Sequence, residues 1–311
     1  MLPAGGVGEA QKEGVVMKVD PQCVPCLLGR ILYEVKLAGG GKDVQKKVIK
    51  RALEIMSKGF SEKVASVELA TEVHRETYSL LGDDDPYREV KRRSTAVAKE
   101  LLPLAENYYR EAEDRLTAAG TLAVVGNLLD FGIMDAITGP EVLKENFRKY
   151  VSEGLHVNHL RRAEKLLLES KDRTVIYFTD NAGEVVFDRF LIEEFKNRGA
   201  KVFLVPKGVP ILTDATVEDL QEADLLEMVD GIYKTSTFYV GVEIGKMDEK
   251  LKKAMEEAAL IVYKGMANYE AVSEPEGYRY RPRMFIMKAK CEPVASSLGV
   301  KKGENVALLQ L

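Results

Sequence analysis

The stretch Thr174–Phe195, TVIYFTDNAGEVVFDRFLIEEF, indicates the fold class of this chain. Residues 174–179 are apolar and β-branched, which predicts a buried strand. The apolar residues of 184–197 recur at helical spacing, so a helix is expected after a short loop. A nearly uninterrupted apolar strand followed by a helix is typical of a parallel sheet that helices cover on both faces.

The same alternation continues through the rest of the sequence. Further apolar runs predict strands at 201–205, 259–263, 284–287 and 305–309. Helices are predicted between them at 217–228 and 247–258. Residues 173–311 are therefore expected to form an α/β core around a mostly parallel sheet.

The first third of the chain has a different pattern, in which apolar residues recur at three- and four-residue steps among charged ones. This pattern predicts amphipathic helices at 43–58, 61–81 and 89–116. We expect residues 17–118 to form a small helical bundle, and the mostly helical residues 119–172 to bridge it to the core. Residues 1–16 are rich in glycine and lack an apolar segment, which predicts a disordered tail rather than a secretory signal.

Composition excludes several classes of protein. The 311 residues include 45 Lys and Arg against 49 Asp and Glu, a formal net charge of −4, and they form no basic module, so no nucleic-acid partner is expected. The longest stretch without a charged side chain, Leu116–Leu129, has 14 residues, whereas a membrane span needs about 18. Three cysteines are too few for a disulfide scaffold, which favours a reducing, cytoplasmic location.

Polar residues follow three of the predicted strands, at the edge where parallel sheets bind ligands. Asp180 and Asn181 follow the first strand, and Asp214 lies beyond the second. These three residues also fit helix caps, although a cap needs only one such side chain. Lys264, after the strand at 259–263, can offer a positive charge to a phosphate, while the oxygen ligands suit a hard divalent cation. The set is typical of metal-assisted phosphoryl chemistry.

Other common sites are missing from the sequence. It contains neither the G-x-G-x-x-G motif after a strand nor the G-x-x-x-x-G-K-[ST] motif of nucleotide-binding loops. Its histidines, His74, His156 and His159, do not follow predicted strands and lack zinc-ligand spacing. A histidine-based zinc hydrolase is therefore not expected.

Several separated segments carry a more specific pattern. They are FTDNAGEVVFDRFLIEEF (178–195), GNLLDF (126–131), ILTDAT (211–216), YKGMANYE (263–270), Asp85-Pro86-Tyr87 with Lys91, and Lys290-Cys291 with Pro293. Taken in their order along the chain, they resemble the damage-control phosphatase family, formerly domain of unknown function 89. The CxxC pair at Cys23 and Cys26 is similar to that of the stand-alone prokaryotic branch.

The resemblance implies a helical N-terminal domain on a Rossmann-like α/β core, and metal-dependent hydrolysis of small phosphomonoesters such as sugar phosphates or phosphopantetheine derivatives. It implies that Asp180, Asn181 and Asp214 bind a divalent cation (Mg²⁺, Mn²⁺, Co²⁺ or Ni²⁺). Lys264 is then the catalytic phosphate contact. Further pocket residues implied are Asn127, Asp130, Glu184, Asp188 and Asn268.

Two other functions remain open. An adenosylmethionine-dependent carboxyl methyltransferase needs no cation, but no glycine-rich loop follows the first strand to hold the nucleoside. A non-catalytic protein that binds a metal or metabolite would bind a sugar phosphate without turnover. For the hydrolase, the nucleophile is either water or Asp180. The absence of a second Asp two residues later departs from haloacid dehalogenases and favours water.

The cysteines allow three interpretations. Cys23 and Cys26 form a CVPC sequence before the first predicted helix, where a helix N-terminus can stabilise a redox-active thiolate. No strand precedes the pair at a thioredoxin-like distance, which argues against this redox role. Together with Cys291 the pair could instead form a soft-metal site with an unknown fourth ligand, or all three could be buried thiols. The oligomeric state is not determined by the sequence.

Overall fold

The computed structural model describes residues 17–129, 140–273 and 279–311. The predicted tail, 1–16, and Asp130 lie outside the described residues.

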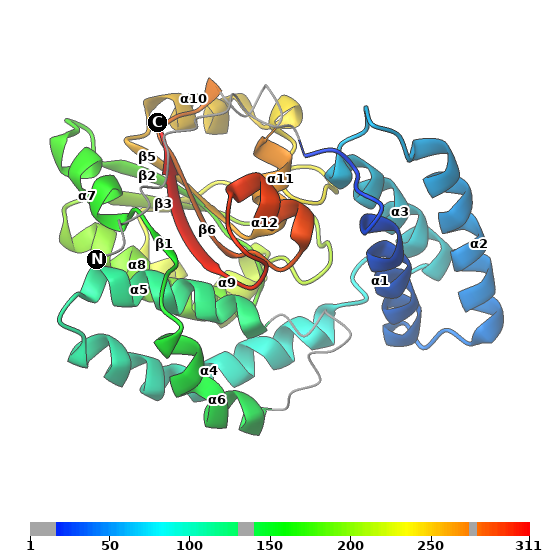
Figure 1. The fold of residues 1–311 in the computed structure, drawn as a ribbon, viewed down its shortest axis with the longest axis horizontal. Coiled ribbons are helices and arrows are strands. Elements are labelled where there is room, and N and C mark those ends of the chain that lie inside the picture. Colours follow the sequence, from blue (N-terminus) through cyan, green and yellow to red (C-terminus); the bar gives the residue numbers. More distant parts are fainter. Residues whose placement is uncertain (1–16, 130–139, 274–278) are drawn as a thin grey trace, which may run out of the picture.

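A seven-stranded sheet forms the centre of the described chain (Figure 1). Its strands are β1 (Val157–Asn158), β2 (Thr174–Phe178), β3 (Lys201–Val205), β4 (Gly231–Ile232), β5 (Leu260–Lys264), β6 (Arg283–Lys288) and β7 (Asn305–Gln310). They lie in the order β1-β7-β6-β5-β2-β3-β4, and neighbours are parallel except for the antiparallel pair β6 and β7. The predicted α/β fold with a mostly parallel, Rossmann-like sheet is confirmed.

The predicted strands coincide with β2, β3, β5, β6 and β7 to within one residue at either end. The two-residue strands β1 and β4 were not predicted, because two residues are too few to show a pattern.

Helices cover both faces of the sheet. Side chains alternate along β2, so that Tyr177 packs in the apolar core on one face and Ile176 in the core on the other. The first face is covered by α4 (Arg88–Glu111), α5 (Arg115–Val125), α6 (Pro140–Ser152), α7 (Leu160–Glu169), α8 (Val185–Asn197) and α9 (Val217–Glu222). The second is covered by α10 (Glu249–Glu257), α11 (Met266–Val272) and α12 (Glu292–Leu298). Short 3₁₀ turns are η1 (Gly126–Leu129), η2 (Leu226–Met228) and η3 (Ile244–Lys246).

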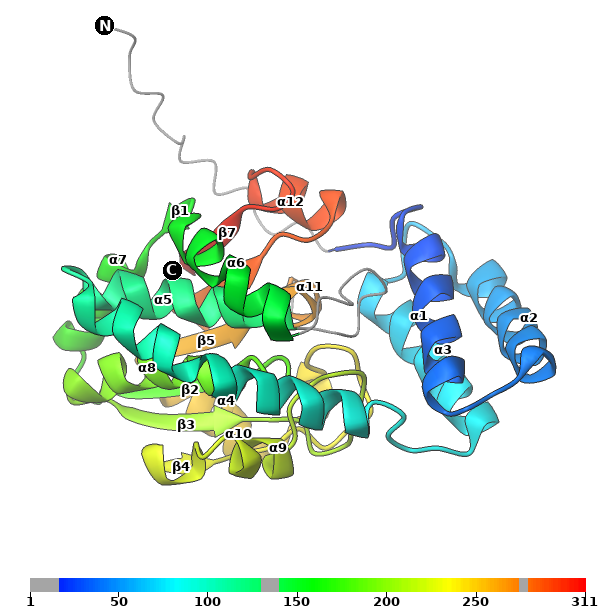
Figure 2. The same ribbon diagram turned by 90° about the horizontal axis from the view of Figure 1, so that it is seen from below.

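A separate helical unit stands at one end of the sheet (Figures 1 and 2). It consists of α1 (Cys23–Leu37), α2 (Lys42–Gly59) and α3 (Ser66–Leu81), which enclose their own small apolar core around Ile31, Val48 and Val73. The predicted boundaries at 118 and 172 stay a prediction, but α4 and α5 pack against α8 in the core of the sheet. The apolar face of α4 was visible in the sequence, but its packing partner was not.

The helical unit is held to the core through α3. The backbone N–H of Leu212 donates to the Tyr78 hydroxyl over 2.9 Å, and that of Val240 donates to Oγ1 of Thr71 over 2.9 Å. Both acceptors lie on one side of α3, because Thr71 and Tyr78 are seven positions, or about two helical turns, apart. The docked side of α3 therefore contacts the loops beyond β3 and β4.

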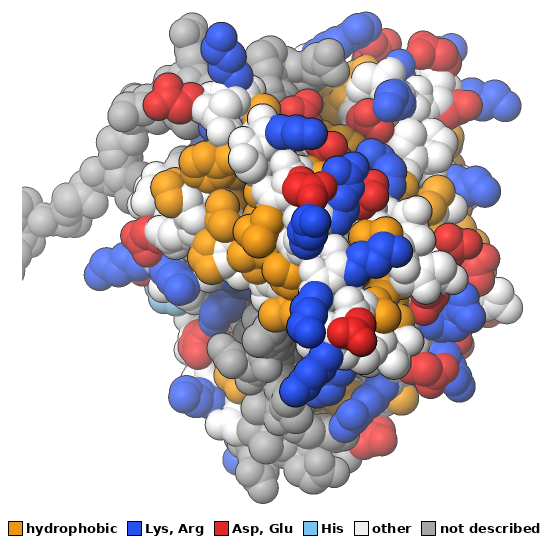
Figure 3. All heavy atoms as spheres, turned by 90° about the vertical axis from the view of Figure 1, so that its right-hand side faces the viewer, with side chains coloured by type: hydrophobic (Ala, Val, Ile, Leu, Met, Phe, Trp, Pro, Cys, Tyr) orange, Lys and Arg blue, Asp and Glu red, His pale blue; other side chains and the backbone are white. Residues whose placement is uncertain are grey.

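The outer end of the helical unit is solvent-exposed. Lys and Arg side chains are interspersed there with Asp and Glu around scattered apolar side chains (Figure 3). This face therefore lacks the continuous positive patch that a nucleic-acid backbone requires. Within the described ranges, no helix has the length and apolar character needed to cross a bilayer.

Candidate active site

A cavity of about 490 Å³ lies between the carboxyl ends of the strands and the helical unit. It is at the switch point of the sheet, where β2 has β3 on one side and β5 on the other. The core lines it with Asn127, Asp180, Asn181, Asp214 and Lys290, among others, and the helical unit with Cys23, Cys26, Arg30 and His74.

Hydrogen bonds between the loops after β2 and β3 bring Asp180 and Asp214 together. The backbone N–H of Ala215 donates to the Asp180 carbonyl over 2.7 Å, and that of Ala182 donates to the Thr213 carbonyl over 2.9 Å. Both aspartates line the cavity, and each is 8% exposed. The two strand ends thus converge as the sequence predicts, whereas metal binding by these residues stays a prediction.

Two asparagine amides orient the Asp180 carboxylate. Nδ2 of Asn181 and Nδ2 of Asn127 each donate to Oδ2 of Asp180 over 2.8 Å. The same amides donate to Oε2 of Glu184, over 2.9 and 2.6 Å. Oδ1 of Asn181 accepts from Oγ1 of Thr213 over 2.6 Å and keeps a second lone pair for a ligand. Asn127, delivered by η1, therefore lines the pocket and also supports Asp180.

Lys264 lies beneath the cavity rather than in its lining. Its side chain is fully buried, and its ammonium donates to Oε1 of Glu184 over 2.7 Å, to the Ala123 carbonyl over 2.9 Å and to Asp188. Although burial lowers the pKa of Lys264, the Asp188 and Glu184 carboxylates outweigh it and hold that pKa above its ordinary value. The predicted contact between Lys264 and a phosphate does not fit this geometry, because all three ammonium hydrogens have acceptors.

Three other residues implied by the resemblance also belong to the support of the site. Glu184 and Asp188 are fully buried at the start of α8, around the Lys264 ammonium. Burial, reinforced by the Glu184 charge, raises the pKa of Asp188 to about 6 against the opposing effect of Lys264. Asn268 donates to the carbonyls of Thr179 and Lys264, over 3.0 and 2.7 Å, and so joins the ends of β2 and β5. These side chains shape the site from below and do not line the cavity.

The residues at this edge fit a divalent cation. Four carboxylates, from Asp180, Glu184, Asp188 and Asp214, stand against three nearby ammonium groups, from Lys207, Lys264 and Lys290. The excess of negative charge suits a doubly positive ion. Two carboxylates and one amide open to a cavity match the incomplete protein coordination that leaves room for water and phosphate oxygens around Mg²⁺.

Gly265 makes room for this arrangement. Its backbone has φ +79°, and a Cβ there would lie 2.0 Å from Oδ2 of Asp180. Only a residue without a side chain allows the end of β5 to pass so close to the carboxylate.

Two lysines at the site carry no role in the sequence-based prediction. Nζ of Lys207 lies 3.3 Å from Oδ2 of Asp214 and donates to the carbonyls of Tyr239, over 2.9 Å, and Gly241. Nζ of Lys290 donates to the Asn127 carbonyl over 3.2 Å, and its residue lines the cavity. Lys290 stands in one of the segments that resemble the family, whereas Lys207, directly beyond β3, could have been found by extending the strand-end argument to basic residues.

Cys23, Cys26 and Cys291 all line the cavity as free thiols. Burial raises the pKa of Cys23 and raises that of Cys291 to about 11, which opposes formation of a reactive thiolate. In the part of the chain that the structure describes, no three His, Cys, Asp or Glu side chains are grouped to hold a metal ion. The three-cysteine metal site stays a prediction. The interpretation as buried thiols is wrong, because Cys26 is exposed and Cys23 and Cys291 are only partly buried.

Comparison with known proteins agrees with this architecture. Residues 19–306 match the model of the damage-control phosphatase ARMT1-like domain. A damage-control phosphatase from Archaeoglobus fulgidus is 39% identical over 295 residues, covering 94% of this chain and 99% of the relative. One from Pyrococcus horikoshii is 32% identical, covering 94% and 98%. The crystal structure of a DUF89 family protein from the same organism superposes with a TM-score of 0.81 at 30% identity, covering 94% and 99%.

The chain therefore belongs to the damage-control phosphatase ARMT1-like (DUF89) family, as its motifs suggested.

Proposed function

We propose that this protein is a metal-dependent phosphatase that hydrolyses small phosphorylated metabolites in a damage-control role. The observation that carries the proposal is the convergence of Asp180, Asn181 and Asp214 at one cavity of about 490 Å³. This volume suits a small molecule. The names of the relatives from Archaeoglobus and Pyrococcus support a phosphate ester as the substrate.

Asp180, Asn181 and Asp214 would hold the cation, one of Mg²⁺, Mn²⁺, Co²⁺ and Ni²⁺. When bound, the cation supplies neutralisation of the negative phosphoryl oxygens. The chain preorganises this site, because Asn127 and Asn181 hold the Asp180 carboxylate and Lys207 holds that of Asp214.

Lys290 is the side chain that we assign to the phosphate in place of Lys264. It belongs to the cavity wall, next to Asn127, and a lysine contributes a compact positive charge to phosphate binding. We assign the nucleophile to water, since Oδ2 of Asp180 already accepts two amide hydrogen bonds. Water forms the new bond to phosphorus and gives up one proton to solvent, the bond from phosphorus to the alcohol oxygen breaks, and the alcohol leaves with a proton taken from solvent.

The test is hydrolysis of p-nitrophenyl phosphate with each of the four cations in turn. Asp180→Ala should lower kcat/KM about 10³-fold, because it removes a charged group at the reacting centre. Asp43→Ala, on an exposed position of α2, is the matched control and should keep full activity. Full activity of Asp180→Ala, or wild-type activity that persists after chelation of all divalent cations, would contradict the proposal.

A panel of phosphorylated metabolites, including sugar phosphates and phosphopantetheine derivatives, then identifies the substrate. Adenosylmethionine binding without any phosphatase activity would favour a methyltransferase instead. Binding of sugar phosphates without turnover under every cation would favour a non-catalytic binding protein.

A further inference from the structure

A buried carboxylate–histidine pair lies in the helical unit, on the side of the cavity opposite the strand ends. Glu34 on α1 is 0% exposed, and His74 on α3 is 1% exposed. Nδ1 of His74 lies 2.7 Å from Oε1 of Glu34, a close contact that lacks hydrogen-bond geometry, and Oε1 accepts from the Tyr87 hydroxyl over 3.3 Å. Oε2 of Glu34 has no hydrogen-bond donor among the described residues.

This pair is costly for a small helical bundle. Burial of a carboxylate costs several kcal/mol unless excellent pairing compensates for the lost hydration, and here one oxygen is left without a donor. The same helices pack Ile31, Val35 and Val73 as ordinary apolar core residues. A polar pair in this place therefore needs a reason other than the stability of the bundle.

The position of His74 supplies that reason. It shares the docked side of α3 with Thr71 and Tyr78, whose hydroxyls bind the core. The contact of Tyr78 is to Leu212, two residues before Asp214. His74 lines the same cavity as Asp180 and Asp214, but from the helical unit. A substrate that extends from the strand ends toward α3 would therefore meet His74.

We propose that His74 is a specificity-determining residue that binds the alcohol portion of the substrate, and that Glu34 is the positioning residue that orients it. With Nδ1 turned to Glu34, Nε2 is the ring nitrogen left for a ligand. A hydroxyl group is both donor and acceptor and suits this nitrogen. The preferred substrates are therefore phosphomonoesters of alcohols that carry at least one further hydroxyl. This inference rests on the proposed phosphatase function.

The kinetic test compares a hydroxylated ester with one that lacks hydroxyls. His74→Phe keeps a ring but removes both nitrogens, so the ratio of kcat/KM for ribose 5-phosphate to that for p-nitrophenyl phosphate should fall about tenfold, mainly through KM. Glu34→Gln should lower the ratio in the same direction, and the double variant should be no worse than His74→Phe alone. His156→Phe, on an exposed histidine that accepts from the N–H of Asn305, should leave both rates unchanged.

The outcomes separate this inference from the proposed function. If wild type hydrolyses p-nitrophenyl phosphate but rejects ribose 5-phosphate, glycerol 3-phosphate and fructose 6-phosphate, the preference for hydroxylated esters is wrong. If both rates of His74→Phe fall equally, or only its melting temperature falls, the residue is structural.

A binding measurement decides the case in which wild type hydrolyses nothing. The chain contains only three histidines, so their ring nitrogens can be resolved by ¹⁵N NMR. Ribose 5-phosphate should shift the His74 signals and spare His156 and His159, whereas inorganic phosphate should shift His74 much less. Glu34→Gln should change the His74 ring signals before any ligand is added. Saturable binding without a shift at His74 would overturn the inference.

Discussion

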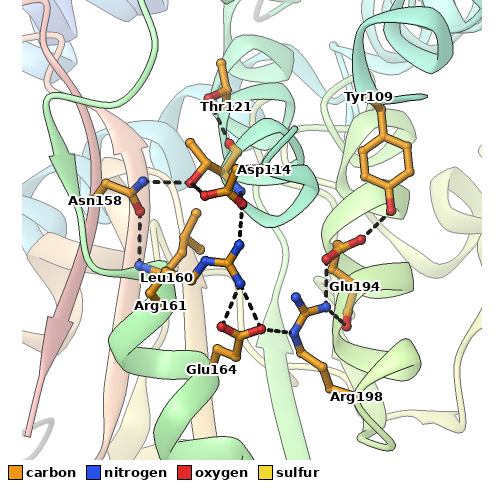
Figure 4. Close-up of polar contacts among 10 residues, drawn as sticks. Tyr109, Asp114, Thr121, Asn158, Leu160, Arg161, Glu164, Glu194 and Arg198 are labelled. Atoms are coloured by element: carbon orange, nitrogen blue, oxygen red, sulfur yellow. Dashed lines mark hydrogen bonds and ion pairs between the residues drawn. The ribbon is translucent and has the colours of Figure 1, made fainter. Parts of the chain in front are cut away.

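Two charged clusters lie at opposite ends of the same pair of helices, α5 and α8, and they differ in how their carboxylates are used. The distal cluster stands where α5 begins and α8 ends (Figure 4). There both oxygens of Asp114, Glu164 and Glu194 accept hydrogen bonds. Most of the donors are guanidinium groups of Arg161 and Arg198. This cluster is saturated by the protein itself.

The site cluster stands where α5 ends and α8 begins. It has more carboxylates than ammonium groups, and Asp180 and Asp214 line a cavity. The excess negative charge of the site cluster is therefore neutralised only by a positively charged ligand that enters the cavity. The comparison teaches that charge alone does not mark a functional site, whereas an excess of one sign at a cavity does. Three experiments test this difference, from the largest expected effect to the smallest.

Removal of the buried ammonium group of Lys264 should have the largest effect on stability. Lys264→Met leaves Glu184 and Asp188 buried without their counter-charge and should lower the free energy of unfolding by about 3–5 kcal/mol. Urea unfolding followed by circular dichroism measures the loss. A second substitution, Asp188→Leu, should recover part of the lost stability, because it removes one of the two buried carboxylates left without a counter-charge. Arg198 lies in the saturated and more exposed distal cluster. If Arg198→Met lowers the free energy of unfolding as much as Lys264→Met does, the proposed difference between the two clusters is wrong.

A single methyl group at the site should have the next largest effect. Gly265→Ala places a Cβ 2.0 Å from Oδ2 of Asp180, so it displaces this carboxylate and should lower kcat/KM about 10²-fold. Gly299→Ala is the matched control, because Gly299 also has positive φ, +70°, but its Cβ would meet nothing within 4 Å. Gly265→Ala should lose more thermal stability than Gly299→Ala, because it adds a steric clash to the strain of positive φ, and only Gly265→Ala should lose activity. Equal activities would show that the position of Asp180 is not critical.

A substitution in the distal cluster should lower stability without changing activity, and its effect should be largest at neutral pH. Burial raises the pKa of Glu164, but hydrogen bonds from Arg161 and Arg198 outweigh it and hold that pKa below its ordinary value. The stabilisation is thus complete above the unfolded pKa of about 4.3 and is lost as pH falls through the lower folded pKa. Glu164→Gln should lower the melting temperature by about 2 °C at pH 7 and by less near pH 3. Thermal unfolding across this pH range measures the effect, and a constant difference would show that the charge of Glu164 is irrelevant.

Much of the core could be predicted from the sequence, because its pattern is local. The apolar strand at 174–179 and the helix after it show their period within a few residues, and the positions of Asp180 and Asp214 follow from strand ends in a parallel sheet. The packing partner of α4 could not be predicted, for the opposite reason. Its apolar stripe has the same sequence pattern whether it packs on α3 or on α8.

Which side chains line the cavity and which support it from below could not be predicted in the same way. Lys264 and Lys290 are both lysines near strand ends, yet one is fully buried under Glu184 and Asp188 and the other lines the cavity. His74 carried no ligand pattern in the sequence, since its partner Glu34 lies on another helix. These roles depend on which elements meet across the gap between the core and the helical unit.

The amino-acid sequence alone determined three features: the strand–helix alternation, the family motifs and the oxygen-bearing residues at two strand ends. Each of them is a pattern among residues that are close together in the sequence. The tertiary structure decided which charges face a cavity and which are paired beneath it. That decision follows from desolvation: the energy of a charged side chain depends on the partners that folding brings to it, and those partners come from distant parts of the chain.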